Sequence, residues 1–323
     1  MNKNLTKKLA PGHSTCAGCG IPAIVRTVLG ATDDPVVVVN ATGCLEVTST
    51  LYPYTAWKVP YIHNAFENAA ATASGIDAAI KALRKKKGVP RRARDDDFDK
   101  IKIVVFAGDG GTYDIGLQSL SGALERGHDF LYVCYDNQGY MNTGGQRSSA
   151  SPYGSSTETT PAGTHDIGNE LIRKDIMQIV DAHHVKYAAQ ANVAFIEDLA
   201  AKAKKAYAAG GPSFLLVLQP CTNLWKYPTS EYVNIGRLAT ETNFWPLYEI
   251  KNGRYVINYP VNPDVASGHG ASLPKKPKPV EEFLKTQGRF KHLFKPENKK
   301  IIEKIQKMVD ERWKELIKKS KGC

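Results

Sequence analysis

Four of the six cysteines in this chain have the surroundings of metal ligands. Cys16 and Cys19 form a C-x-x-C pair, Cys44 closes the segment Asn40-Ala-Thr-Gly-Cys44, and Cys221 lies far downstream in Gln219-Pro-Cys221. In a chain without a secretory signal, such a pair serves metal binding or redox chemistry rather than a disulfide framework. Zinc ribbons offer a second close pair, whereas Cys44 and Cys221 stand alone. Four thiolates from dispersed loops therefore fit a [4Fe–4S] cluster at least as well as a structural zinc ion.

The other two cysteines lack such surroundings. Cys134 falls inside the apolar segment 130–135 and is expected to be a buried core residue, and Cys323 is the last residue. A coincidental group of buried cysteines is the remaining alternative for the first four.

A Gly-rich turn with an aspartate forms the second candidate site. Gly108-Asp109-Gly110-Gly111 follows an apolar run, and the next apolar run ends at Asp136-Asn137. The glycines let a ligand approach the backbone closely. A helix starting near Asp114 presents a positive dipole end, which suits a phosphate. Carboxylate and amide oxygens suit Mg²⁺. The two strand ends therefore predict a diphosphate bound through Mg²⁺. The alternatives are a turn capped by Asp109 beside an Asn-containing β-turn, and a dinucleotide site, whose G-x-G-x-x-G motif follows no strand here.

The elements that must position these residues alternate between apolar strands and helix-like segments, which is typical of an α/β fold with a parallel sheet flanked by helices. Two further apolar runs, 247–250 and 254–259, flank Asn252-Gly253 and predict a hairpin. Because parallel strands end at one edge of a sheet, we expect both candidate sites at that edge. The sequence predicts strands at 36–40, 101–106, 130–135 and 214–218, helices at 64–83, 115–125, 171–182, 195–209 and 298–319, and irregular segments at 84–99, 148–163 and 260–279.

Composition restricts the class of protein. The 323 residues are 42% hydrophobic and carry a net charge of +11, and no apolar stretch reaches the roughly 18 residues of a membrane span. The N-terminus has no apolar core behind its lysines, so we expect a cytoplasmic protein. The basic segments 81–94 and 275–319 are interpreted as solvated surfaces; they carry no recognisable nucleic-acid module, and attraction to an acidic protein partner stays open. The strand pattern weakens after residue 233, so we expect an α/β domain over 1–233 and an irregular C-terminal extension over 234–323.

Several independent motifs resemble the β subunits of the 2-oxoacid:ferredoxin oxidoreductases, in particular of pyruvate:ferredoxin oxidoreductase, and the resemblance covers nearly the whole chain. The matching segments are His13–Gly20, Asn40–Glu46, Tyr52–Trp57, Phe66–Ala70, Gly108–Gly111, Tyr135–Asn137, Tyr140–Gly144, Arg237–Glu249, Lys278–Lys285 and Gly288–Lys291.

The resemblance implies a thiamine-diphosphate-binding fold and two inorganic cofactors. Mg²⁺ would be held by Asp109, Asn137 and the carbonyl of Gly139, and a [4Fe–4S] cluster by Cys16, Cys19, Cys44 and Cys221. Asn142 would lie near the reacting carbon and hydrogen-bond the substrate. The positions expected to contact thiamine diphosphate are Gly43, Cys44, Gly108, Asp109, Gly110, Gly111, Asn137, Asn142 and Thr143.

The resemblance also implies a reaction and partners. Pyruvate would be oxidatively decarboxylated to acetyl-CoA and CO₂, with electrons passing through the cluster to ferredoxin. An α subunit would supply the pyrimidine half of the thiamine site, and γ and ferredoxin-like δ subunits, or fusions of them, would complete the assembly. Under this interpretation residues 1–233 carry the cofactors, residues 234–323 wrap partner subunits, and the chain alone is catalytically incomplete.

Some positions leave alternatives open. Glu67 is interpreted as bracing a subunit interface rather than activating the aminopyrimidine, and His63 as a packing or hydrogen-bonding residue. Thr222-Asn-Leu-Trp225 and Gln138-Gly139 depart from the family pattern and put the substrate in doubt. The alternatives are the β subunit of an oxalate oxidoreductase, which uses no CoA, a non-oxidative thiamine decarboxylase with structural zinc, and a metal-stabilised assembly subunit.

Overall fold

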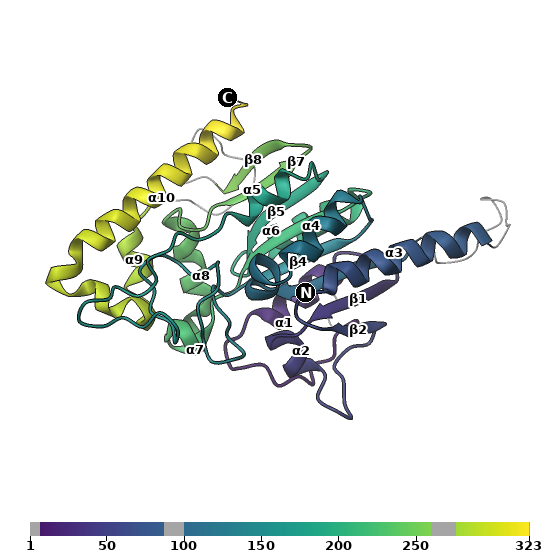
Figure 1. Cartoon of the computed structure of the whole chain (residues 1–323), viewed down its shortest axis with the longest axis horizontal. Helices are drawn as coiled ribbons and strands as arrows, with labels where there is room; N and C mark the ends of the chain where they lie inside the picture. The colour runs from purple at the N-terminus through teal and green to yellow at the C-terminus, as the bar shows by residue number, and fades with distance from the viewer. Residues whose placement is uncertain (1–6, 87–99, 260–275, 323) are drawn as a thin grey trace.

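The computed structural model describes residues 7–86, 100–259 and 276–322, which fold around one large β-sheet (Figure 1). Within these residues the strands lie in the order β2-β1-β3-β4-β6-β5-β7-β8, and all neighbours as far as β5 are parallel. β7 and β8 continue the sheet in antiparallel pairing. The predicted α/β class with a parallel sheet is confirmed. The strands are β1 (Val36–Ala41), β2 (Tyr61–Asn64), β3 (Lys102–Gly108), β4 (Leu131–Asp136), β5 (Tyr187–Asn192), β6 (Ser213–Leu218), β7 (Leu247–Lys251) and β8 (Arg254–Tyr259).

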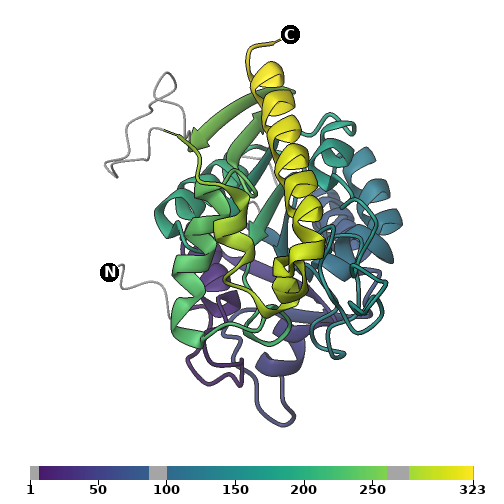
Figure 2. The ribbon, with the colours of Figure 1, turned by 90° about the vertical axis from the view of Figure 1, so that its left-hand side faces the viewer.

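The central strands alternate their side chains between two apolar cores. In β3, Val105 and Ala107 face one core, whereas Val104 and Phe106 face the other. The helices α3, α4 and α5 cover the first face and α1 and α6 the second (Figures 1 and 2). The sheet is therefore buried on both sides, as parallel sheets require.

The helices match the predicted ones with shifted ends. The helix expected at 64–83 begins at Ala69, because Asn64 ends β2, and the helix expected at 171–182 is confined to Ile176–Asp181. The helices are α1 (Ile21–Leu29), α2 (Cys44–Ser49), α3 (Ala69–Lys86), α4 (Leu117–Glu125), α5 (Ile176–Asp181), α6 (Ile196–Ala208), α7 (Thr222–Trp225), α8 (Tyr232–Glu241), α9 (Val280–Leu284) and α10 (Lys299–Ser320), with short π or 3₁₀ turns η2 (Gly110–Asp114), η3 (Thr229–Glu231), η5 (Gly288–Phe294) and η6 (Pro296–Asn298).

Two strands of the structure, β2 and β5, were not predicted from the sequence. β2 is a short edge strand, and β5 reads Tyr-Ala-Ala-Gln-Ala-Asn, which has few of the branched side chains that mark a strand. Both owe their conformation to the neighbouring strands with which they pair. The segment 148–163 contains no helix or extended strand, as predicted.

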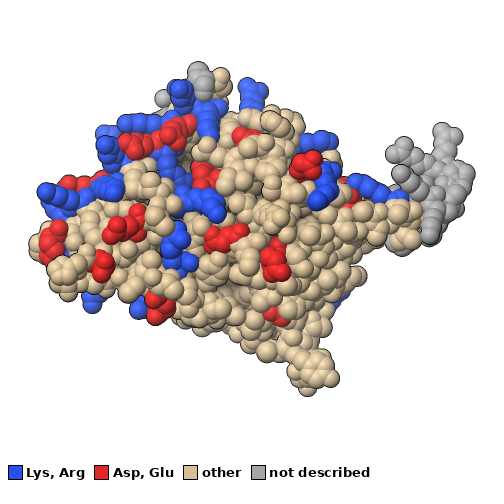
Figure 3. All heavy atoms as spheres, viewed as in Figure 1, with Lys and Arg blue, Asp and Glu red and all other residues tan. Residues whose placement is uncertain are grey.

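The C-terminal segment begins with the predicted hairpin. Asn252 and Gly253 adopt positive φ angles of 48° and 76°, as a two-residue hairpin turn requires. α10 packs on β8 and α9 and carries many of the basic side chains on the face shown in Figure 3. Most of the irregular segments predicted at 84–99 and 260–279 lie outside the described residues, and the boundary at 233/234 stays a prediction. No helix in the described part of the chain is long and apolar enough to span a membrane.

Candidate active site

Asp109 and Asn137 follow the ends of the neighbouring strands β3 and β4, where Gly108 lies opposite Tyr135. The backbone N–H of Asn137 donates to Oδ1 of Asp109 over 3.3 Å. Burial and the nearby carboxylate of Asp136 raise the pKa of Asp109 well above its usual value, although the hydroxyl of Ser148 donates to its other oxygen. A buried carboxylate in this setting favours a cation beside it.

Three oxygen atoms converge here, and one of them is Oδ1 of Asp109 itself. The side-chain oxygen of Asn137 lies 2.9 Å from the main-chain oxygen of Gly139 and 2.8 Å from Oδ1 of Asp109, and it faces only acceptors. Turning the amide would place its nitrogen there as a donor to both oxygens. The predicted magnesium ligands Asp109, Asn137 and Gly139 are thus brought together at one point.

The Gly-rich turn is tighter than a regular helix start. Helical backbone begins at Gly110, directly after Asp109, as the π turn η2, so the start expected near Asp114 is wrong by one turn. A Cβ on Gly110 would lie 2.4 Å from the ring of Tyr140, and one on Gly111 would lie 3.2 Å from the carbonyl oxygen of Phe66. Glycine is therefore required where the backbone passes under this ring.

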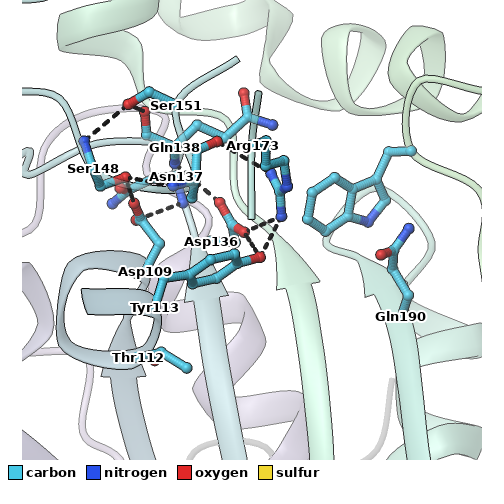
Figure 4. A network of polar contacts seen from close by, with 12 residues as sticks. Asp109, Thr112, Tyr113, Asp136, Asn137, Gln138, Ser148, Ser151, Arg173 and Gln190 are labelled. Atoms are coloured by element: carbon cyan, nitrogen blue, oxygen red, sulfur yellow. Dashed lines mark hydrogen bonds and ion pairs between the residues drawn. The ribbon is translucent and has the colours of Figure 1, made fainter. Parts of the chain in front are cut away.

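A buried ion pair fixes the end of β4 (Figure 4). Nη2 of Arg173 lies 2.6 Å from Oδ2 of Asp136, and the hydroxyl of Tyr113 donates to the same oxygen over 2.7 Å. The guanidinium also packs on the ring of Trp245, 4.6 Å from its centroid. Sequence reasoning missed this pair, because it treated Arg173 as part of a helix; the residue instead extends into the core and holds the strand end that precedes Asn137.

The loop after Asn137 presents exposed polar side chains. The hydroxyl of Tyr140 donates to Asp114 over 2.8 Å, and that of Thr143 donates to the carbonyl oxygen of Tyr140 over 3.3 Å. Asn142 and Thr143 are both exposed, on the loop that follows the converging oxygens. Their predicted roles toward substrate and cofactor stay predictions.

The four candidate cysteines come from three loops at the same edge of the sheet. Cys16 and Cys19 precede α1, Cys44 starts α2 just after β1, and Cys221 lies between β6 and α7. Burial, with a smaller contribution from repulsion by the other thiolates of this group, raises the pKa of Cys19 and of Cys44 to about 12. Such thiols become thiolates only beside a cation or cluster. The predicted burial of Cys134 within β4 is confirmed.

Two amide side chains point at the sulfur atoms. Nε2 of Gln219 lies 3.9 Å from Sγ of Cys19, and Nδ2 of Asn223 lies 3.7 Å from Sγ of Cys16. Neither donor was predicted, although Asn223 falls in the segment that departs from the family pattern. Across the described ranges, no three His, Cys, Asp or Glu side chains are arranged to hold a single metal ion.

The remaining candidates lie at the edge of this site. Gly43 lies beside Tyr135, whose hydroxyl would be 3.1 Å from a Cβ at that position. His63 is exposed, with Nε2 2.8 Å from the hydroxyl of Thr42 and 3.8 Å from Glu46, and Glu67 is also exposed. The hydrogen-bonding interpretation of His63 agrees with this contact, and the interface role of Glu67 stays a prediction.

Comparisons with known proteins identify relatives over almost the whole chain. The family model described as the C-terminal TPP-binding domain of thiamine pyrophosphate enzymes matches residues 41–217. The chain is 50% identical to the pyruvate synthase subunit PorB of Methanocaldococcus jannaschii, covering 95% of both chains, and 48% identical to that of Thermotoga maritima, covering 96% of this chain and 91% of the relative. It is 46% identical to the ketoisovalerate oxidoreductase subunit VorB of Pyrococcus abyssi, with 95% and 91% covered.

A solved structure shares the fold. The 2-oxoglutarate:ferredoxin oxidoreductase of Magnetococcus marinus superposes with a TM-score of 0.55 at 22% identity over 69% of each chain. Because identities near 50% extend over almost the whole length, the chain belongs to the family of thiamine pyrophosphate-binding subunits that includes the pyruvate synthase PorB and ketoisovalerate oxidoreductase VorB subunits.

Proposed function

We propose that the chain is the thiamine-diphosphate-binding β subunit of a 2-oxoacid:ferredoxin oxidoreductase whose substrate is pyruvate. The observation that carries the proposal is the placement of converging oxygens and four cysteines along one edge of one sheet. The names of the PorB relatives support pyruvate, and none of the relatives named above is described as acting on oxalate.

The converging oxygens fit Mg²⁺. An octahedral ion with oxygen ligands at 2.0–2.1 Å has neighbouring ligands about 2.9 Å apart, and the oxygen of Asn137 has two oxygen neighbours at 2.8 and 2.9 Å. Asp109, Asn137 and Gly139 would hold the ion, which would bind the diphosphate above the glycines of η2. When bound, thiamine diphosphate supplies the nucleophilic carbon that makes decarboxylation of a 2-oxoacid feasible.

The chain's own residues keep these oxygens in place. Ser148 donates to the Asp109 oxygen that does not face Asn137, which orients the carboxylate. Arg173 neutralises Asp136 and so reduces the repulsion between Asp136 and Asp109. Asn142, on the loop that follows, is proposed to hydrogen-bond the substrate.

The four cysteines fit a [4Fe–4S] cluster better than zinc. Thiolates on one zinc ion lie about 3.8 Å from each other, given the Zn–S distance of 2.3 Å and tetrahedral geometry. No three described His, Cys, Asp or Glu side chains are arranged to hold a single ion, whereas the four thiols, which come from three loops, act electrostatically on one another. Amide donors directed at sulfur are a regular feature of clusters.

The proposed partners follow from the family resemblance and from the relatives' being named as subunits. An α subunit would supply the pyrimidine half of the site, γ and ferredoxin-like δ subunits would complete the complex, and ferredoxin would accept the electrons in the cytoplasm. CoA would accept the acetyl group.

The test uses the complex purified anaerobically with its partner subunits. Reduction of a viologen dye is measured with pyruvate plus CoA, with 2-oxoisovalerate plus CoA, because of the VorB relative, and with oxalate alone. We expect the highest kcat/KM with pyruvate and no dye reduction with oxalate. Zinc without iron in the purified chain would refute the electron-transfer function, and dye reduction by oxalate without CoA would refute the substrate.

A further inference from the structure

Arg289 is a buried cation without an anionic partner. The residue is 2% exposed and lies in η5, far from the cysteines in sequence. Its Nε and Nη2 atoms donate to the side-chain oxygens of Gln287 and Gln138 over 2.9 and 2.7 Å, and both acceptors are uncharged. Its Nη1 atom has no partner among the described residues. Burying such a charge is costly unless an anion balances it.

The Arg289 guanidinium contacts the loops of both candidate sites, through Trp225 and through Gln138. It stacks on Trp225, with Cζ 3.8 Å from the ring centroid, and the backbone N–H of Trp225 donates to the carbonyl oxygen of Cys221 over 3.2 Å. On its other side, Gln138 follows the magnesium-ligand candidate Asn137. Arg289 therefore lies one short helical turn from a cysteine of the proposed cluster.

Among the acidic groups around Arg289, Cys221 acts most strongly on its charge. Burial lowers the pKa of Arg289, and the Cys221 thiolate is the group that most strongly opposes this, ahead of Tyr227 and Asp136. Asp136 is already paired with Arg173, so the four cysteines of the proposed cluster would bring the negative charge that balances Arg289.

We propose that Arg289 is the counter-charge of the iron–sulfur cluster and raises its reduction potential. The proposal rests on the proposed function, because it requires a cluster on Cys16, Cys19, Cys44 and Cys221. Each electron that the cluster accepts converts one ferric to one ferrous equivalent and adds a negative charge, which a fixed buried cation stabilises. Arg289 is a positioning residue: it touches neither substrate nor reacting atoms, and it makes the cluster a better acceptor.

The test is a redox titration, followed by EPR, of the cluster in the anaerobic complex. Cys221→Ser identifies the signal that belongs to this chain. Arg289→Met removes the charge with little change in volume, Arg289→Lys retains it, and Arg254→Gln removes an exposed cation on the hairpin as the matched control. Gln138→Glu is a second way to remove the effect of the charge, because the new carboxylate would pair with Arg289 and neutralise it in place. It replaces a side-chain nitrogen that has no partner among the described residues.

We expect Arg289→Met and Gln138→Glu to shift the potential to more negative values. The expected tenfold fall in the ratio of reduced to oxidised cluster corresponds to about 59 mV for one electron. Arg289→Lys and Arg254→Gln should stay close to wild type. If the Arg289→Met chain does not assemble into the complex, the potential measured in Gln138→Glu alone tests the proposal.

Three results would overturn the proposal. An unchanged potential with full iron content would remove the electrostatic role, and equal shifts in Arg289→Met and Arg289→Lys would indicate a structural role only. If Arg289→Met binds thiamine diphosphate more weakly at an unchanged potential, the anion that Arg289 balances is the diphosphate and not the cluster. Absence of iron from the wild-type chain would be a different failure, that of the proposed function itself.

Discussion

The indole N–H of Trp225 donates to the main-chain oxygen of Asn137 over 2.9 Å. Trp225 ends the short helix that follows Cys221, and Asn137 carries the amide at the converging oxygens. One hydrogen bond thus joins the loop of a cluster-ligand candidate to the loop of a magnesium-ligand candidate. Both loops follow neighbouring strands, β4 and β6, at the same edge of the sheet.

Asp109→Asn should abolish productive cofactor binding. The amide keeps the shape of the carboxylate but lacks its negative charge, so Mg²⁺ loses its only anionic ligand among the three candidates. We expect the affinity for thiamine diphosphate to fall at least about 100-fold, since even groups that only support metal ligands are worth 10–100-fold. Calorimetric titration with Mg²⁺ and thiamine diphosphate measures this, with Glu125→Gln on the exposed end of α4 as control. Unchanged affinity in Asp109→Asn would exclude this carboxylate as a ligand.

Replacing Cys16, Cys19, Cys44 or Cys221 individually by serine should deplete the chain of iron. Wild type should hold about four irons and four sulfides from this site, and each variant should lose most of them. Cys134→Ala is the matched control, because this cysteine is fully buried in β4 and points into the apolar core. Iron and sulfide analysis of anaerobic preparations is the measurement. Equal iron in all five variants would place the cluster elsewhere.

Arg173→Leu should destabilise the fold strongly. It leaves the carboxylate of Asp136, which is 0% exposed, with Tyr113 but without its cation. Breaking a buried pair in this way costs about 3–5 kcal/mol. Urea unfolding measures the loss, and the double variant with Asp136→Asn should recover much of it. A double variant as unstable as Arg173→Leu would show that the stacking on Trp245, not the charge, accounts for the effect.

Glu249 should make stability depend on pH in the acid range. Burial acts to raise the pKa of Glu249, but hydrogen bonds from Lys205, Tyr187 and Asn258 outweigh it and lower the pKa to about 2. Since the folded pKa lies below the unfolded value of about 4.3, the stabilisation is complete above that value and is lost as the pH falls toward about 2.

The comparison variant is Glu249→Gln. At neutral pH it should be less stable than wild type by about 1.5–3 kcal/mol, the value of a hydrogen bond to a charged group. The difference between the two unfolding free energies should shrink steadily below pH of about 4. A difference that stayed constant through this range would show that the charge of Glu249 does not stabilise the fold.

The sequence predicted the parts of the site that lie at strand ends. Asp109 and Asn137 each follow an apolar strand. Because parallel strands end at a common edge, the sequence alone indicates that these two residues lie close together. The supporting residues could not be predicted in this way. Arg173 lies in an irregular segment and Arg289 in the 3₁₀ turn η5, and packing against Trp245 and Trp225 determines where their guanidinium groups lie.

Alanine-rich β5 was missed for a related reason. Its residues have low intrinsic strand preference, and pairing with β6 and β7 on either side imposes the conformation. The same limit applies to Asn223, whose contact with Cys16 joins segments far apart in the sequence.

A freeze-quench experiment tests whether this chain couples a thiamine site to its own iron–sulfur cluster. The anaerobic complex is mixed with pyruvate and CoA, frozen within a single turnover and examined by EPR, alongside the Asp109→Asn complex. We expect pyruvate to reduce the Cys221-dependent cluster in wild type, whereas in Asp109→Asn only dithionite should do so. Reduction of that cluster by pyruvate in both complexes, or in neither, would refute the coupling of the two sites.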